Sequence, residues 1–282
     1  MRPAAALLPG GRLHLQHGPI DLVIGADGDR AAAFAAARAR FETVLSELVE
    51  ELDLLRRPVG SAVGATGETA RRMTEATAPH ADGLTSPMAA VAGAVAETVL
   101  AAMTRAAPLS RAYVNNGGDI ALHLAPGTSY TLAVATPDGR ALGTVRIDAV
   151  DKVRGIATSG QGGRSLSLGI AEAVTVLAQT AAAADVAATR IANAVDLPGH
   201  PAIRRAPADT LRDDSDLGAT PVVTHVGALS GAEVARALDA GRAVAEDMRR
   251  AGLIEGAALF LRGEAASVGP ARLIPERIPL HA

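Results

Sequence analysis

The sequence predicts an α+β fold in which antiparallel sheets pack against helices. Short runs of alternating apolar and polar residues are joined by turns rich in Gly and Pro, as in β-hairpins. Longer segments between them carry apolar residues at helical spacing. Strand pairs, a helix and further strand pairs recur in both halves of the 282 residues. This order predicts one pseudo-duplicated domain over residues 1–269, followed by a loosely ordered tail over residues 270–282.

The first half is expected to open with a β-ribbon over residues 11–25, turning at residues 17–19. A long helix from residues 27–30 to about residue 55 and a short helix over residues 68–76 follow. Ser86 and Pro87 predict the N-cap and first position of a helix over residues 88–107. The small residues in its first turns allow a close approach, to another backbone in the first interpretation and to a ligand in the second.

Four strands are expected next, over residues 112–115, 119–124, 131–135 and 143–147. Asn116-Gly117 predicts a type I′ turn between the first two strands. The loop contains two glycines flanked by Asn and Asp, which is more than such a turn requires. An alternative is that its amides face a ligand while Asp119 orients the loop.

The second half contains a strand over residues 173–178 and an alanine-rich helix with one polar line. Asp185, Thr189 and Asn193 fall at i, i+4 and i+8, so they share a helix face. Their apolar surroundings predict a largely buried seam, in which polar groups need partners. Those partners are either backbone groups of a neighbouring layer, or a hard cation and a polar ligand. Further elements are strands over 222–226 and 257–261, and a helix over 231–251 between Ser230 and Gly252.

Composition excludes several classes of protein. A net charge of −3 and a pI near 6.2 give no basic footprint for nucleic acid. The absence of Cys excludes disulfides, thiolate zinc sites and a cysteine nucleophile. Residues 89–107 come nearest to a membrane span, but Glu97 and Arg105 interrupt them. We therefore expect a soluble cytoplasmic protein that binds neither nucleic acid nor membrane.

A Gly-rich cluster over residues 155–165 combines four glycines, three hydroxyl residues and Arg164. Backbone amides, short hydroxyls and a guanidinium suit a pyrophosphate or a carboxylate. In particular, Arg164 would present a two-pronged contact to phosphate. The spacing is neither that of a Walker A loop nor that of a dinucleotide fingerprint. A flexible surface loop is the alternative interpretation.

Three segments together resemble the ApbE-like FAD:protein FMN transferases. Residues 115–119 resemble the family's N-x-G-G-D motif, and residues 157–160 resemble its A-T-S-G motif. Residues 174–176, followed by residues 184–189, resemble its V-T-V and A-D-A-x-x-T signature. Their order and spacing agree across residues 86–195. The resemblance implies a T-fold-like arrangement, FAD or a related nucleotide as ligand, and Mg²⁺ as cofactor.

The resemblance also implies roles for individual residues. Asp185 and Thr189 would hold Mg²⁺ beside the pyrophosphate, together with a backbone oxygen of Ala92. Asp119 and His200 are candidate catalytic bases by their chemistry alone. The candidate ligand-binding residues of the motifs and of the Gly-rich cluster are Asn115, Gly117, Gly118, Thr158, Ser159, Gly160, Gly162, Gly163, Arg164 and Ser165.

The sequence departs from the family pattern at two places. Ala92 stands where the family usually has Lys, and the family's H-x-x-D-P segment is absent between Gly160 and Val174. Two functions are therefore considered. One is Mg²⁺-dependent FMN transfer or cleavage at the FAD pyrophosphate. The other is a non-catalytic small-molecule-binding or accessory protein on the same scaffold. The ligand is expected to be a small phosphorylated molecule, and the sequence leaves open a protein acceptor and a homo-oligomer.

Overall fold

The computed structural model describes residues 3–61, 64–81, 85–135, 141–163, 165–212, 215–269 and 274–275. The chain forms two compact units, each assembled from three segments. Unit 1 contains Met1–Tyr130, Ile147–Ala157 and Ala178–Val186, and unit 2 contains Thr131–Arg146, Thr158–Leu177 and Ala187–Ala282. Helices and antiparallel strand pairs make up both, which confirms the predicted α+β class.

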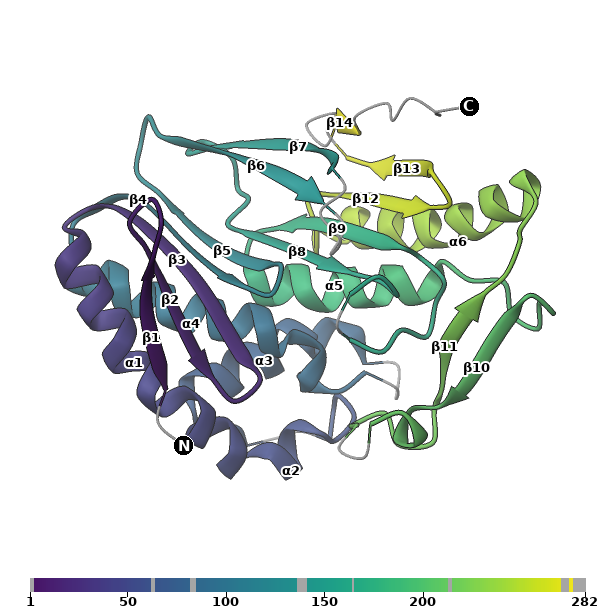
Figure 1. Cartoon of the computed structure of the whole chain (residues 1–282), viewed down its shortest axis with the longest axis horizontal. Helices are drawn as coiled ribbons and strands as arrows, with labels where there is room; N and C mark the ends of the chain where they lie inside the picture. Colours follow the sequence, from purple (N-terminus) through teal and green to yellow (C-terminus); the bar gives the residue numbers. More distant parts are fainter. Residues whose placement is uncertain are drawn as a thin grey trace. The chain divides into compact units, whose positions relative to one another are not determined.

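Unit 1 contains an antiparallel sheet whose strands follow the chain. The order is β1 (Ala4–Leu8), β2 (Arg12–His17), β3 (Ile20–Gly28), β4 (Leu109–Asn116) and β5 (Asp119–Leu124), with β8 (Gly155–Ser159) next to β5 (Figure 1). The predicted ribbon is confirmed, because β2 and β3 pair on either side of a Gly18-Pro19 turn. Strand β1 was not predicted. Its residues are mostly exposed, so it lacks the alternation that marks a half-buried strand.

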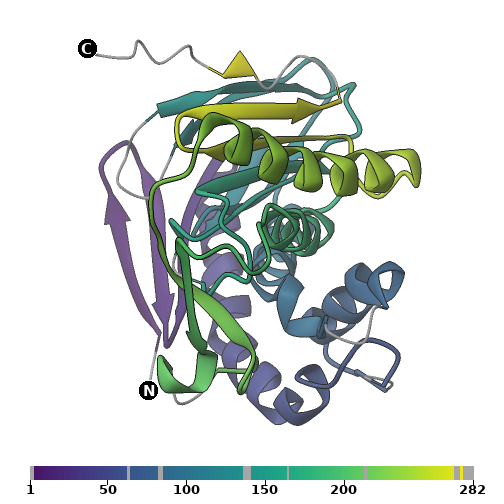
Figure 2. The ribbon, with the colours of Figure 1, turned by 90° about the vertical axis from the view of Figure 1, so that its right-hand side faces the viewer.

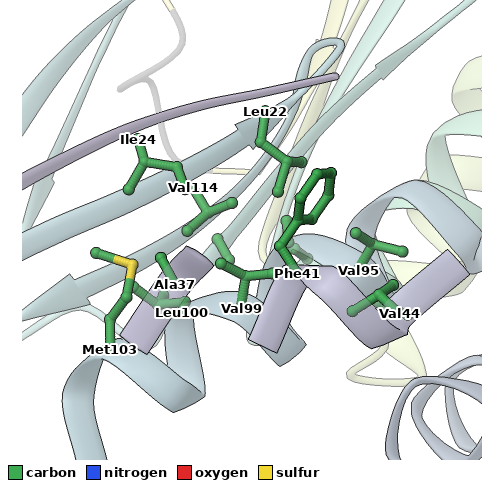
Figure 3. Packing of buried hydrophobic residues seen from close by; sticks show 14 of the residues in the cluster. Leu22, Ile24, Ala37, Phe41, Val44, Val95, Val99, Leu100, Met103 and Val114 are labelled. Atoms are coloured by element: carbon green, nitrogen blue, oxygen red, sulfur yellow. The ribbon is translucent and has the colours of Figure 1, made fainter. Parts of the chain in front are cut away.

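Helices α1 (Arg30–Glu50) and α4 (Val91–Ala106) pack on this sheet and form its core. Figure 3 shows Leu22 and Val114 of the strands facing Phe41 of α1 and Val99 of α4. Asp29 caps α1 by accepting the Ala32 amide at 3.1 Å. The remaining helices of unit 1 are α2 (Leu52–Leu55), α3 (Glu68–Thr77) and the 3₁₀ turns η1 (Ala78–His80) and η2 (Pro87–Ala90).

The continuous segment Pro87–Ala106 is long and apolar enough to cross a membrane by length and composition alone. Of its most apolar window, 56% is buried inside the protein. Core helices of soluble proteins pass the same test. Its apolar character is thus explained by its packing in the core of unit 1.

Unit 2 contains the end of β8, then β9 (Ala173–Ala178), β12 (Gly256–Leu261) and β13 (Glu264–Val268) as neighbours in that order. Helix α6 (Gly231–Arg250) packs along β12 and β13 (Figure 2). Ser230 and Glu233 form a capping box at its start, and Gly252 follows its end at φ 73°. The predicted bounds of this helix are therefore confirmed.

Smaller sheets complete the structure. Strands β10 (Ile203–Pro207) and β11 (Pro221–Val226) form an antiparallel pair, and β14 (Ile274–Pro275), β7 (Ala141–Asp148) and β6 (Ser129–Ala135) form a three-stranded sheet. A 3₁₀ turn, η3 (Ala208–Thr210), follows β10. Neither β10 nor η3 was predicted. Most of the predicted tail lies outside the described residues. Internal duplication, the T-fold-like arrangement and the boundaries of a single domain stay predictions.

Candidate functional site

Two glycines of unit 1 let α4 and β8 approach the start of α5 (Ala181–Ala194). A Cβ placed on Gly93 of α4 would lie 2.3 Å from the Ala181 carbonyl oxygen. A Cβ on Gly155 of β8 would lie 2.1 Å from the Thr180 carbonyl carbon. Cβ atoms do not approach backbone this closely, so both positions require glycine. These contacts support the packing interpretation of the small residues in α4.

The carboxylate of Asp185, on α5, caps α4. Its Oδ2 accepts the Gly93 amide at 3.0 Å, and the carboxylate also accepts the Ala92 amide. These amides belong to the first turn of α4, where no intrahelical acceptor exists. A negative charge is favourable there because it opposes the helix dipole. The predicted start is confirmed in position, because Ser86 is the N-cap residue and Pro87 the first residue of η2, which continues directly into α4; the Ser86 side chain makes no capping bond.

Glu97 of α4 in turn caps the N-terminus of α5. Its Oε1 accepts the Ala182 amide at 2.7 Å, and the Thr180 hydroxyl accepts the Ala183 amide at 3.1 Å. The two helices thus cap each other through one carboxylate each. From the sequence alone, Glu97 is only a charge that interrupts an apolar segment. The available signal was its isolation among buried alanines and valines, because such a carboxylate needs a partner.

Asp185 has an unusual charge environment. Burial of its carboxyl group raises its pKa from 3.8 to about 7, although the amides of Gly93 and Ala92 act in the opposite direction. The residue as a whole keeps some exposure, but the carboxyl group itself is enclosed. None of the described residues places a cationic side chain on it. Asp185 is therefore an enclosed carboxylate without a counter-charge.

The loop between β4 and β5 lies one residue later than predicted. Asn116 pairs with Asp119, so the turn is Gly117-Gly118, and both glycines have positive φ, at 66° and 117°. The predicted Asn116-Gly117 turn was therefore wrong by one position. The reason is tertiary: Asn116 is buried and donates its Nδ2 to the Ala92 carbonyl at 3.1 Å, which keeps it in β4. Asn115 steadies the turn by accepting the Gly118 amide at 2.8 Å.

Unit 1 therefore brings two predicted motifs together through residues 92 and 93. Asn116 contacts Ala92, and Asp185 contacts both Ala92 and Gly93. Thr189 follows Asp185 by one turn of α5. A carboxylate, a hydroxyl and a carbonyl are hard oxygen donors of the kind that Mg²⁺ prefers, and the Ala92 carbonyl keeps a second lone pair. The described part of the chain has no cluster of three or more His, Cys, Asp or Glu side chains suited to a metal. The chemistry of this donor set nevertheless fits Mg²⁺.

In unit 2, the A-T-S-G motif contacts the V-T-V motif. The hydroxyls of Thr158 and Thr175 lie 2.9 Å apart. Gly160 has φ 142°, and a Cβ there would lie 2.7 Å from the Glu172 carbonyl oxygen. Ser159 is half-buried next to it. The motif residues thus form a tight strand exit that requires glycine.

The Gly-rich turn that follows is exposed at Gly162, Gly163 and Ser165. The Gly162 amide donates to the Glu172 carbonyl at 3.3 Å, and the Gly163 amide donates to the Gly160 carbonyl at 3.1 Å. Both amides therefore already have carbonyl acceptors. Arg164 lies outside the described residues, and the phosphate-binding role of this turn stays a prediction.

His200 uses both ring nitrogens within unit 2. Its Nδ1 accepts the Ala202 amide at 3.2 Å, so Nε2 carries the proton and donates to Glu233 at 2.8 Å. Backbone and side-chain bonds from Ser230, together with this bond from His200, lower the pKa of Glu233 to about 2. His200 thus extends the capping box of α6.

Asn193 continues the polar line of α5 in unit 2 with a backbone partner. Its Oδ1 accepts the Leu168 amide at 3.0 Å. For Asn193, the structure favours the first of the two alternatives, a network with backbone groups. Asp185 also has backbone partners, yet its charge remains uncompensated.

Comparison with known proteins places these observations in a family. A family model described as AbpE bacteria matches residues 5–267. The chain belongs to the AbpE bacteria family. Membership confirms the ApbE-like resemblance of the three motifs at the level of the family.

Relatives of this AbpE bacteria chain include the UPF0280 proteins of Methanopyrus kandleri, 41% identical over 137 residues, and of Methanococcoides burtonii, 36% identical over 121 residues. These matches cover 48% and 43% of the chain and span about half the length of each relative, 52% and 50%. The apo flavinyl transferase ApbE of Pseudomonas stutzeri overlaps with a TM-score of 0.43 at 13% identity, over 96% of both chains. The flavin transferase ApbE of Vibrio cholerae gives 0.40 at 13% identity, over 96% of this chain and 98% of the other.

Proposed function

We propose that this chain binds FAD or a related nucleotide through its pyrophosphate, with Mg²⁺ held by Asp185, Thr189 and the Ala92 carbonyl. The observation that carries the proposal is the enclosed Asp185 carboxylate, which lacks a cationic side chain. A divalent cation would supply the missing charge. The motif resemblance supplies the class of ligand, and the apolar core packing of Pro87–Ala106 is consistent with a cytoplasmic protein.

The chain's own residues fix this arrangement before a ligand arrives. The amides of Ala92 and Gly93 orient the Asp185 carboxylate, and Asn116 orients the Ala92 carbonyl. Such preorganisation avoids the cost of ordering the donors during binding. Asp185, Thr189 and the Ala92 carbonyl would hold Mg²⁺, whose charge would neutralise the pyrophosphate and polarise it toward attack.

The Gly-rich turn is proposed to bind phosphate through its own donors. Thr158 and Ser159 offer hydroxyls, and Ser165 and Arg164 follow in the exposed turn. The amides of Gly162 and Gly163 would exchange their carbonyl acceptors for phosphate oxygens, which are stronger acceptors because they are charged. The remaining candidates, Asn115, Gly117 and Gly118, would shape the loop between β4 and β5.

Transfer would proceed by attack of an acceptor hydroxyl, from a protein or from water, on the FMN-side phosphorus, with AMP as the leaving group. His200 is a poor base because Nδ1 already accepts a hydrogen bond and Nε2 carries the proton. Asp119 is then the base of choice between the two candidates. The same state of His200, together with the missing H-x-x-D-P segment, favours the second candidate function, a binding or accessory protein without transfer.

Calorimetric titration with FAD tests the proposal, in Mg²⁺ and in a chelator. Asp185→Asn should weaken binding about tenfold or more in Mg²⁺, equivalent to roughly 1.4 kcal/mol, and should have little effect in the chelator. Glu75→Gln, an exposed carboxylate on α3, is the matched control and should behave like the unchanged protein. Equal affinities of the Asp185→Asn variant and the unchanged protein in Mg²⁺ would exclude the metal site. Mass analysis for released AMP then separates transfer or cleavage from binding alone.

A further inference from the structure

A cavity of about 220 Å³ lies within unit 1. Its lining includes the apolar residues Leu100 and Ala101 of α4 and Leu122 of β5, and the charged residues Arg72, Glu97 and Arg154. None of the residues assigned above to the nucleotide or to Mg²⁺ lines it. It is also smaller than the pockets that hold drug-sized ligands, about 300–1,000 Å³, so it does not fit a dinucleotide.

Arg154 leaves a positive charge at this cavity. Its terminal nitrogens donate to the carbonyl oxygens of Asp151 and Val153 at 2.6 Å and of Ala149 at 2.7 Å. Carbonyl oxygens fix the guanidinium in place but carry no net charge to neutralise it. Among the described residues, no carboxylate forms an ion pair with Arg154. A rigidly held cation is therefore available to a ligand.

Arg72 also lines the cavity, but two carboxylates already neutralise its charge. Its terminal nitrogens bond Glu97 and Glu68, each at 3.1 Å, while its Nε is buried and has no acceptor among the described residues. Buried donors in proteins nearly always have a partner. Because this nitrogen has almost no accessible surface, a ligand in the cavity cannot reach it, and Arg154 supplies the charge that a ligand would meet.

The charged and apolar lining residues together define the ligand. We propose that this cavity binds a small organic carboxylate with a short aliphatic chain, the carboxylate pairing with Arg154 and the chain contacting Leu100, Ala101 and Leu122. Glu97 also lines the cavity and disfavours a multiply charged anion such as phosphate. The site is independent of the nucleotide proposed above.

Butyrate is the probe, titrated into the full chain and followed by NMR chemical shifts. We expect saturable shifts at millimolar concentration with butyrate, and at least tenfold weaker binding of uncharged butyramide and of inorganic phosphate. Ala101→Leu, which fills the cavity and removes no charge, should abolish the shifts. Ala106→Leu, at an exposed position of the same helix, is the matched control and should stay within about twofold of the unchanged protein.

Arg154→Gln should weaken butyrate binding about tenfold or more. Its melting temperature is measured alongside, because Arg154 also holds three carbonyls of its own turn. Ala101→Leu keeps the proposal testable if Arg154→Gln fails to fold. Equal binding of butyrate and butyramide, tighter binding of phosphate, absence of saturable shifts, or unchanged butyrate affinity in Ala101→Leu would each overturn the proposal.

Discussion

Two features of its surroundings shift the pKa of Asp185 in opposite directions. As the cap of α4 it gains from being ionised, because two backbone amides point at it. As an enclosed group without a counter-charge it gains from being neutral. Burial has the larger effect, which is why the pKa rises to about 7 despite the amides. The folded protein therefore holds a proton on Asp185 more tightly than the unfolded chain does.

This balance predicts a pH dependence of stability. The folded state binds a proton at Asp185 more tightly than the unfolded state, where the pKa is near 3.8. The contribution of Asp185 is thus fully present below that value and is lost as pH rises toward about 7, at up to about 1.4 kcal/mol per pH unit. The side chain at position 185 does not titrate in the Asp185→Asn variant. The free energy of unfolding of this variant, relative to that of the unchanged protein, should therefore rise as pH increases from about 4 to about 7 and stay constant at higher pH.

Urea unfolding at several pH values without divalent cations measures this difference directly, because the other titrating groups cancel between the two proteins. A difference that does not change with pH would show that the carboxyl group is well solvated. Saturating Mg²⁺ at alkaline pH should narrow the difference if the cation binds Asp185.

Spacing alone predicted the polar line on α5, but not what its members contact. The i, i+4 pattern is local, so Asp185, Thr189 and Asn193 could be placed on one face from the sequence. Their partners come from other segments: Gly93 lies 92 residues from Asp185, and Leu168 lies 25 residues from Asn193. No local rule supplies such pairs.

At the scale of elements, the close approach of α4 and α5 rests on a single glycine. Gly93→Ala would force a Cβ to within 2.3 Å of the Ala181 carbonyl oxygen, where only backbone can move. In an exposed helix the same change stabilises by about 0.5–1 kcal/mol, because Gly is a poor helix former. Here we expect the clash to dominate and to destabilise the protein by about 1–3 kcal/mol.

Gly231→Ala is the matched control for this change. Gly231 is the first residue of α6, and a Cβ there would meet nothing within 4 Å. Urea unfolding should show an unchanged or slightly raised free energy for Gly231→Ala and a lowered one for Gly93→Ala. If the two variants behave alike, the helices do not approach as closely as described.

The caps and turns show where sequence reasoning reaches its limit. Ser230 and Asp29 cap the helices that directly follow them, so local rules found both starts. Ser86 and Pro87 likewise mark the start of the segment that leads into α4, but the free amides in the first turn of α4 are capped by Asp185, a residue distant in the chain. In the same way, Asn116 has the local signature of a turn residue, yet its buried bond to Ala92 keeps it in a strand.

At the scale of the molecule, the class of fold was predictable and the interleaving of its units was not. Hairpins and helix faces are encoded by periodicities within about ten to twenty residues. The division into units depends on which distant segments pair, and each unit draws on three of them. The buried cluster of unit 1 includes Ala181, Ala182 and Val186. These residues pack in the same core as the N-terminal sheet and helices, although they come much later in the sequence.

This interleaving predicts that unit 1 cannot fold from its N-terminal segment alone. A fragment of residues 1–130 contains α1, α4 and β1–β5 but lacks Ile147–Ala157 and Ala178–Val186. It would leave Gly93 and Glu97 without their partners and expose the apolar surface that Ala181, Ala182 and Val186 cover. We expect poor dispersion in its amide NMR spectrum and no cooperative thermal transition. A fragment of residues 1–186 includes every segment of unit 1 and should recover dispersed amide signals for α4 and β4. A cooperatively folded 1–130 fragment would contradict this prediction, because it would show that the core of unit 1 forms without Ile147–Ala157 and Ala178–Val186.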